Sequence, residues 1–128
     1  MIKSVDRNAV IEFQSRGRDD YVVRCTDAGL SAEATVQHVV GDELKEFFGD
    51  LAAEWRGWRG VKVFRSLVGT LLIKASADKQ GHVALLVVLA YGAPSKWETH
   101  LGLTVEAGQL ERLADAAEVF CRDLQGAV

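Results

Sequence analysis

A proline-free run of nine apolar residues at positions 83–91 constrains the fold of this chain more than any other feature. The run is about half as long as a membrane-spanning helix needs to be. At the edge of a sheet, it would be an aggregation site. We therefore expect an interior strand with a neighbour on each side and both faces covered. Two helices could cover one face each, or both helices could share one face while the other face is buried in a dimer. On this interpretation Leu86→Asp should unfold the domain, because a buried, unpaired carboxylate is very costly.

Alternating apolar and polar residues predict further strands before and after this run. The predicted strands cover residues 9–14, 20–26, 30–40, 61–66, 70–77 and 96–106. The sequence Asp-Lys-Gln-Gly at 78–81 is typical of a hairpin turn, with glycine where a positive φ is needed. Small residues at the inward positions of the third strand indicate that another element packs closely against it. These residues are Ala32, Ala34 and Val36.

Two helices are predicted, one after the third strand and one at the end of the chain. Asp42 suits an N-cap, because its carboxylate can accept hydrogen bonds from first-turn amides. The first apolar stripe contains Leu44, Phe47, Phe48, Leu51 and Trp55, and the second contains Leu110, Leu113, Ala114, Ala117, Phe120, Cys121 and Leu124. The element order is then βββαββββα, and the links between strands are too short for parallel crossovers. We expect one α+β domain over residues 1–128, with a mostly antiparallel sheet of about six to seven strands.

Composition excludes several classes of protein. The chain is 48% hydrophobic and 26% charged, the mix of an ordinary soluble domain. A net charge of −3 gives no field that attracts nucleic acid or an anionic membrane. The first residues lack the apolar segment of a signal peptide. Without an export signal, Cys25 and Cys121 are expected to be reduced core residues, which predicts a cytoplasmic location.

The residue types that carry chemistry are not arranged for it in the sequence. His38, His82 and His100 have no metal-ligand spacing. Ser76 and Asp78 lie close to His82, but no nucleophile-elbow glycine pattern surrounds the serine. The sequence Gly-Trp-Arg-Gly at 57–60 lacks the features of a phosphate loop. We therefore predict no catalytic residue, no metal and no cofactor, and favour binding over catalysis.

A basic and aromatic cluster is the candidate binding site. Its residues are Trp58, Arg56, Arg59, Lys62 and Arg65. Basic residues among aromatics can bind a nucleic acid backbone and stack its bases, but the negative net charge disfavours that partner. Two interpretations stay open. The cations could pair with the acidic face of the preceding helix, with Trp55 in the core and Trp58 capping the helix end. Alternatively, the cluster could contact a protein, since Trp and Arg dominate binding hot spots.

From Phe47 onward the chain carries a recognisable set of motifs. They are Phe-Phe-x-x-Leu-Ala-x-x-Trp-x-Gly-Trp from Phe47, Ser-Leu-x-Gly-x-Leu from Ser66, Ala-x-x-Asp-x-x-Gly-His-Val from Ala75, then Trp97, Leu101 and Glu-Ala-Gly-Gln-Leu-Glu from Glu106. This pattern resembles an uncharacterised family of short bacterial single-domain proteins, a domain of unknown function. The resemblance covers nearly the whole chain after Asp42 and implies no activity.

The leading hypothesis is a non-catalytic protein-interaction module that forms a homodimer or binds another protein. An immunity or accessory protein is one form of this hypothesis, by analogy with small bacterial proteins that neutralise secreted toxins. The alternative is a small-ligand-binding domain or an unrecognised enzyme with a pocket between sheet and helix. The inward positions are nearly all apolar, with Thr99 as the exception, so the sequence shows no polar pocket.

Overall fold

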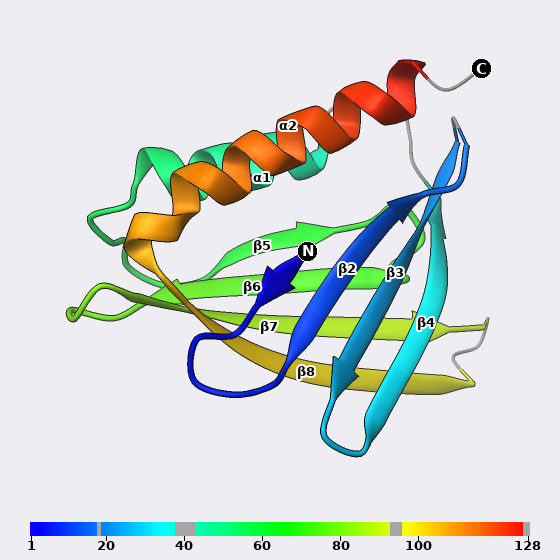
Figure 1. Cartoon of the computed structure of the whole chain (residues 1–128), viewed down its shortest axis with the longest axis horizontal. Helices are drawn as coiled ribbons and strands as arrows, with labels where there is room; N and C mark the ends of the chain where they lie inside the picture. The colour runs from blue at the N-terminus through cyan, green and yellow to red at the C-terminus, as the bar shows by residue number, and fades with distance from the viewer. Residues whose placement is uncertain (18, 38–42, 93–95, 127–128) are drawn as a thin grey trace.

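Eight strands and two helices form the part of the chain that the structure, a computed structural model, describes: residues 1–17, 19–37, 43–92 and 96–126 (Figure 1). The strands are β1 (Ile2–Lys3), β2 (Val10–Ser15), β3 (Asp20–Asp27), β4 (Leu30–Gln37), β5 (Lys62–Arg65), β6 (Leu71–Ala77), β7 (His82–Tyr91) and β8 (Trp97–Glu106); the helices are α1 (Glu43–Ala53) and α2 (Leu110–Gly126). Predictions that concern Asp42, His38 and the turn around Pro94 lie outside these residues.

The strands form two four-stranded antiparallel sheets, in the orders β1-β2-β3-β4 and β5-β6-β7-β8. We call them sheet A and sheet B. The α+β class and the antiparallel pairing are confirmed, whereas the prediction of one sheet with six to seven strands is wrong. The strand missing from the prediction is β1, whose Ile2 lies opposite Ile11 of β2.

The turn at 78–81 joins β6 to β7 as predicted. The Asp78 carboxylate accepts hydrogen bonds from the backbone amides of Gln80 and His82, at 2.8 and 2.9 Å. These bonds, with that from His82 first, hold the pKa of Asp78 below its usual value. Gly81 has a φ of +84°, which favours glycine. The register that follows places β7 between β6 and β8, so the predicted interior strand is confirmed.

The two sheets are joined along β1 and β8. The Val5 amide donates to the Thr104 carbonyl at 2.8 Å, and the Thr104 amide donates to Ser4 Oγ at 3.0 Å. On the other side β4 packs against β7. The small inward residues of β4, including buried Ala34, permit this close approach, as the sequence predicted. The sheets therefore enclose one core between them.

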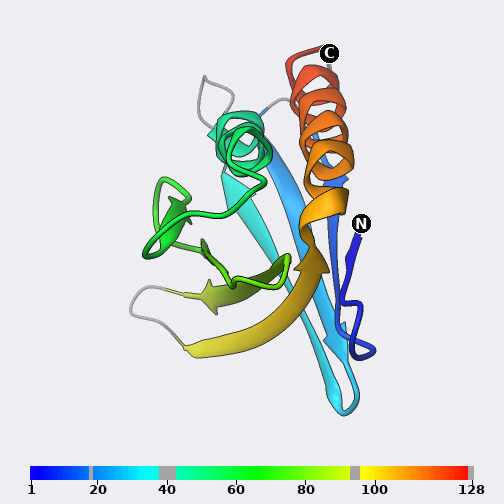
Figure 2. The same cartoon turned by 90° about the vertical axis from the view of Figure 1, so that its left-hand side faces the viewer.

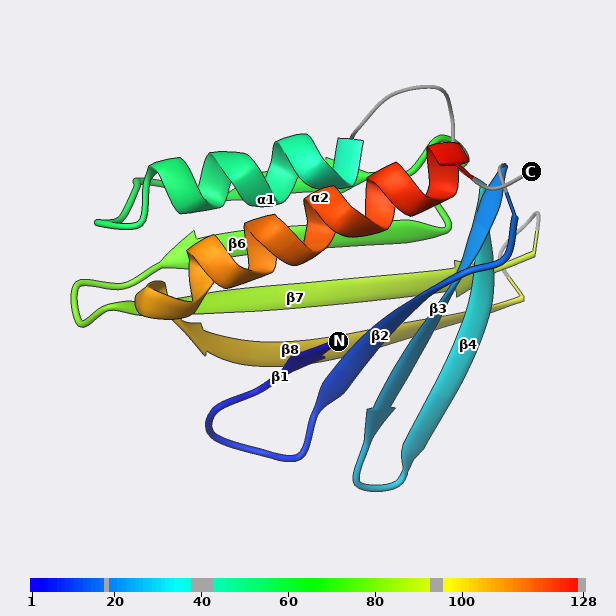
Figure 3. The ribbon, with the colours of Figure 1, turned by 45° about the horizontal axis from the view of Figure 1, so that its top comes forward.

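Both helices lie on one side of the molecule, above the opening between the sheets (Figure 2). Figure 3 shows α1 and α2 side by side and antiparallel. The α1 stripe from Leu44 to Leu51 is buried. Its predicted last member, Trp55, is 53% exposed, because α1 ends at Ala53. A short 3-10 turn leads into α2, and a capping box between Glu106 and Gln109 fixes the start of that turn.

Aromatic rings connect sheet A to α2 inside the core. The Tyr21 and Phe120 rings meet edge to face at 5.5 Å, and Phe13 contacts Phe120 at 6.0 Å. Cys25 and Cys121 are both buried, which confirms their predicted place in the core. Burial raises the pKa of Cys25 to about 11, so this thiol stays protonated near neutral pH.

The two faces of β7 differ in a way the sequence did not predict. Leu85 on the inner face is 2% exposed, whereas Leu86 on the outer face is 37% exposed. The expectation that both faces of β7 are covered is therefore wrong for a single chain. Of the two arrangements considered from the sequence, the structure has the one in which both helices share a face.

Because Leu86 is partly exposed, Leu86→Asp should not unfold the protein, contrary to the expectation from the sequence. We predict that Leu85→Asp abolishes folding, because it buries a carboxylate without a partner. Leu86→Asp should stay folded and lose about 1 kcal/mol of stability, since water reaches its side chain. Far-UV circular dichroism and urea denaturation of the two variants check this. An unfolded Leu86→Asp chain beside a folded Leu85→Asp chain would contradict the assignment of the two faces.

Candidate functional site

Trp58, the centre of the predicted binding cluster, is held by the protein itself. Its ring is half-buried and packs against the hydrophobic core. The indole N–H donates to the backbone carbonyl of Ala75 at 3.2 Å. The Lys62 ammonium lies 5.6 Å from the ring centroid, within the range of a cation–π interaction. Trp58 therefore stabilises the junction between the end of α1 and sheet B.

The expected pairing of the basic cluster with the helix does occur, but through a lysine. Lys62 Nζ lies 2.7 Å from Glu54 Oε2 and 2.9 Å from Asp50 Oδ2. Hydrogen bonds to Glu54 and then to Asp50 raise the pKa of Lys62. Its side chain is thus occupied on both sides, by the carboxylates and by the Trp58 ring.

The three predicted arginines do not join Trp58. Arg56 lies 5.2 Å from the ring centroid of Trp55 and leaves both side chains exposed. Arg59 is exposed in the loop that precedes β5. Arg65 is on the face of sheet B that points away from the core, next to Leu72 of β6. The structure therefore brings together Trp58 and Lys62 and separates the arginines.

His82 and His100 each contact a nearby carboxylate, His82 in the β6–β7 turn and His100 on the surface of β8. His82 Nδ1 lies 3.3 Å from Asp78 Oδ2, and His100 Nε2 lies 3.0 Å from Glu98 Oε2. Ser76 lines the same groove as His82, but no hydrogen bond joins the two in the part of the chain that the structure describes. Within that part, no group of three His, Cys, Asp or Glu residues could hold a metal ion.

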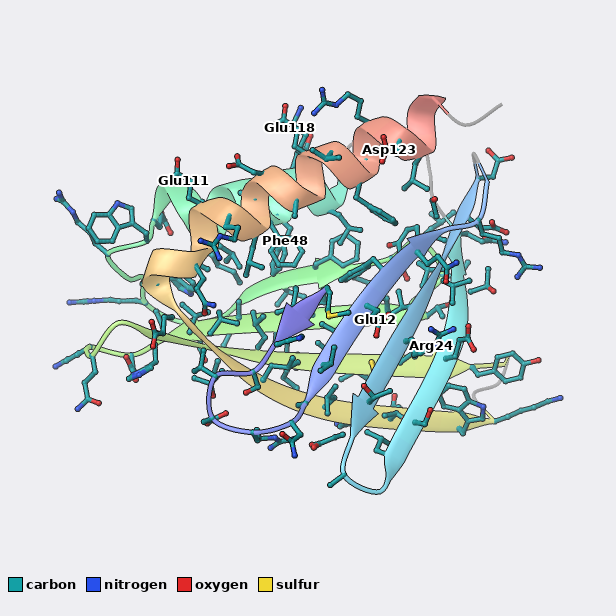
Figure 4. The ribbon with its side chains drawn as sticks, viewed as in Figure 1. Glu12, Arg24, Phe48, Glu111, Glu118 and Asp123 are labelled. Atoms are coloured by element: carbon teal, nitrogen blue, oxygen red, sulfur yellow. The ribbon has the colours of Figure 1, made fainter. Side chains whose placement is uncertain are left out.

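The outer faces of the two sheets differ in chemistry. On sheet A, Glu12, Arg24 and Glu33 lie opposite one another on neighbouring strands, and Arg24 pairs with Glu33 at 3.0 Å (Figure 4). The exposed side of α2 carries acids, including Glu111 and Glu118. Both surfaces are polar, as water-facing surfaces usually are.

On sheet B the outer face carries exposed aliphatic side chains among a few polar ones, and we call it the sheet B face. It comprises Val61 and Val63 at the β5 edge, Leu72, Lys74 and Ser76 on β6, Ala84, Leu86 and Val88 on β7, and His100, Gly102 and Thr104 on β8, with Arg65 and Glu98 on its flanks. Leu67 and Val68, each 65% exposed, lie in the β5–β6 turn at the end of these strands. Three of the large apolar side chains that the described residues expose, Val61, Val63 and Leu86, thus gather on one face. Such clustering marks contact surfaces, whereas single exposed apolar residues do not.

The sheet B face is hollowed near its β8 side. A groove of about 380 Å³ runs beside Leu86 and Gly102, with Asp6 and Arg7 of the β1–β2 loop at its border. A Cβ atom placed on Gly102 would meet nothing within 4 Å, so the space above this glycine is open. The surface therefore offers both protruding aliphatic side chains and a recess.

A second apolar hollow lies between the helices and sheet A. It has a volume of about 230 Å³ and is lined mainly by Phe13, Leu44, Phe48 and Phe120, with the Asp123 carboxylate at its border. Figure 4 places Phe48 beneath the helix pair and Asp123 near the C-terminal end of α2. This is the position, between sheet and helix, that the alternative hypothesis from the sequence requires.

The sequence contained a signal for the sheet B face. Val88 and Leu86 belong to the run that is apolar on both faces, and Leu72 and Val63 sit at outward positions of the neighbouring strands. An apolar residue at an outward position on three adjacent strands indicates a second buried surface. The prediction from the sequence explains these apolar residues by a strand covered on both faces, whereas the structure leaves Leu86 at an open surface.

These features define a small antiparallel α+β domain with one polar and one apolar outer sheet face. The chain belongs to a family of unknown function (DUF6228), whose model matches residues 2–123. The resemblance to a domain of unknown function is thereby confirmed. Searches of curated proteins and of solved structures found no match. No helix among the described residues has the length and apolarity to cross a membrane.

The structure makes Trp58 a stabilising residue, and its neighbour Trp55 is a natural control. We predict that Trp58→Ala lowers the free energy of unfolding by roughly 2–4 kcal/mol, because it removes core packing and the bond to Ala75. Trp55→Ala should cost about 0.5 kcal/mol or less, since Trp55 is largely exposed. Urea denaturation of both variants measures this. Equal stability of the two variants would mean that the Trp58 ring contributes nothing to the fold.

Proposed function

We propose that this protein is a non-catalytic protein-interaction module that binds its partner through the sheet B face. The observation that carries the proposal is the gathering of exposed Val61, Val63 and Leu86 on the outer face of sheet B. The two helices lie on the other side of this sheet (Figure 2). Burying aliphatic side chains contributes about 25 cal/mol per Å² of apolar surface. The polar outer face of sheet A offers no comparable gain.

The partner is a protein, either another chain or a second copy of this one, as expected from the sequence. Apolar centres flanked by charged residues are typical of protein interfaces. Arg65, part of the originally predicted cluster, retains a role here as a flanking residue, together with Lys74 on the next strand. An immunity or accessory role is the form of this proposal that the analogy with toxin-neutralising proteins suggests. We propose a cytoplasmic location, since Cys25 is a buried cysteine without a disulfide, as is usual in a reducing compartment.

The test uses the proteins encoded by the genes next to this one, each produced together with the tagged chain. A partner should co-purify with the wild type and be lost from Leu86→Asp, because a carboxylate at the apolar centre would be desolvated on binding. Val119→Asp is the matched control, since Val119 is 47% exposed on α2 and lies away from the sheet B face. It should retain the partner. A partner that binds Leu86→Asp as well as it binds the wild type would contradict the proposed surface.

The hollow beneath the helices favours a second candidate function, binding of a small apolar ligand. Its wall of Phe13, Phe48 and Phe120 suits an aromatic or short aliphatic molecule, and Asp123 is the ionisable side chain beside it. A cationic group on the ligand would be favoured at that border. Ligand pockets are commonly apolar with a few polar groups that set orientation.

This candidate predicts a rise in melting temperature with small aromatic amines such as tryptamine, and a smaller rise with indole, which lacks the cationic group. Ala117→Leu, which lengthens a side chain in the wall of the hollow, should reduce both shifts. A thermal-shift assay with the two compounds measures this. Absence of any shift at millimolar ligand, or equal shifts in wild type and Ala117→Leu, would rule the hollow out as their binding site.

A further inference from the structure

We propose that the occupant of the sheet B face is a second copy of this chain, packed face to face with a two-fold axis parallel to the strands. The proposal rests on the proposed contact surface and names its partner. It follows from how side chains are arranged across the four strands. An interface with two-fold symmetry must be complementary to itself, so that each residue meets a suitable residue of the same surface.

The apolar centre of the sheet B face meets this condition. Leu72 of β6 and Val88 of β7 are directly opposite each other in one row across the sheet. A two-fold axis that runs between β6 and β7, parallel to the strands, places each row of one copy against the same row of the other copy in reverse order. Strand β5 then faces β8 of the second copy, and β6 faces β7. Leu72 of one copy then meets Val88 of the other, twice per dimer. Because Val88 is only 8% exposed within one chain, the apolar surface that a dimer would bury here comes mainly from Leu72 and from Leu86 in the next row, which is 37% exposed.

The next row pairs a protrusion with the recess. It runs from Val63 on β5 through Lys74 and Leu86 to Gly102 on β8. Reversing the row places Val63, which is 52% exposed, over Gly102 of the second copy, where the groove is open. The same operation lays the aliphatic stem of Lys74 across Leu86 of the second copy, and the two Lys74 side chains lie on either side of the axis.

Charges select this axis over the alternative. The cations Arg65 and Lys74 occupy the β5 and β6 half of the sheet B face, and neither forms an ion pair with a described residue. The acids Glu98 and Glu106 occupy the β8 side. An axis parallel to the strands sets Arg65 over His100 of the second copy, whose Nε2 lies 3.0 Å from Glu98 Oε2, so that Arg65 comes near this carboxylate. An axis across the strands would set β5 of one copy on β5 of the other, so that the two Arg65 side chains would lie on the same side of the interface, away from Glu98.

The size of the surface limits the affinity. Four strands about 4.8 Å apart and roughly seven residues long, at about 3.4 Å per residue, give a face of roughly 20 by 24 Å, on the order of 500 Å². This is at the small end of stable protein interfaces, which bury about 800 Å² per partner. We therefore expect a dimer that dissociates in the micromolar range, and a subunit that keeps its fold when separated, because each chain has its own core.

Sedimentation velocity across the micromolar range tests the proposal. The wild type should shift from monomer to dimer with rising concentration. Leu86→Asp should remain monomeric, and Val119→Asp should dimerise like the wild type. Arg65→Glu and Glu98→Arg should each weaken the dimer about tenfold, and the double variant should recover most of that loss, since it restores opposite charges across the interface.

The outcomes separate this inference from the proposed function. A wild type that stays monomeric at every concentration overturns the dimer, and the co-purification test still decides the surface. A dimer that Leu86→Asp leaves intact overturns both. A dimer that Leu86→Asp disrupts but the double charge variant does not restore overturns the axis. Because the two charge variants lie on the exposed flanks, they test the proposal even with a poorly folded Leu86→Asp protein.

Discussion

The hydrogen bonds between the Ser4–Val5 segment and Thr104 determine how the rest of the structure is arranged. They hold the β1 edge of sheet A against the β8 edge of sheet B, so that the apolar inner faces meet on one side and diverge on the other. The open side needs a cover, and α1 and α2 together provide it (Figure 2). With both helices used there, neither helix covers the far side of sheet B in the part of the chain that the structure describes. The apolar contact surface is thus a consequence of how the sheets are joined.

Much of the fold was predictable because the spacing of apolar residues along the sequence depends directly on whether a segment is a helix or a strand. The stripe from Leu44 to Leu51 identified α1, the Asp78 turn identified the β6–β7 hairpin, and strict alternation identified most strands. The division into two sheets was not predictable in this way. Alternation shows that a residue such as Val23 points inward, but it does not say which strands pair or where a sheet ends. The two-residue β1 is too short to show any period at all.

The binding site was harder to predict, for reasons that Trp55 and Trp58 illustrate. The helical spacing of Trp55 continued the α1 stripe, yet the helix ends before it and the ring points outward. Trp58 follows a glycine and had no local reason for burial, but the Ala75 carbonyl, 17 residues later, accepts its N–H. The three-residue spacing of the basic cluster would align on a helix. In the loop and strand that form instead, it distributes the cations over different faces.

The joint at Thr104 also bears on how the protein is made. Ser4 and Val5 are synthesised well before their partner Thr104, which is 100 and 99 positions further along the chain. Sheet A can pair β2 with β3 and β4 early, but its N-terminal edge has to wait until nearly the whole domain has left the ribosome. Contacts between such distant residues slow folding, and the unfinished domain exposes strand edges in the meantime. The step that completes this fold therefore depends on contact between two segments of the nascent chain that lie 100 residues apart.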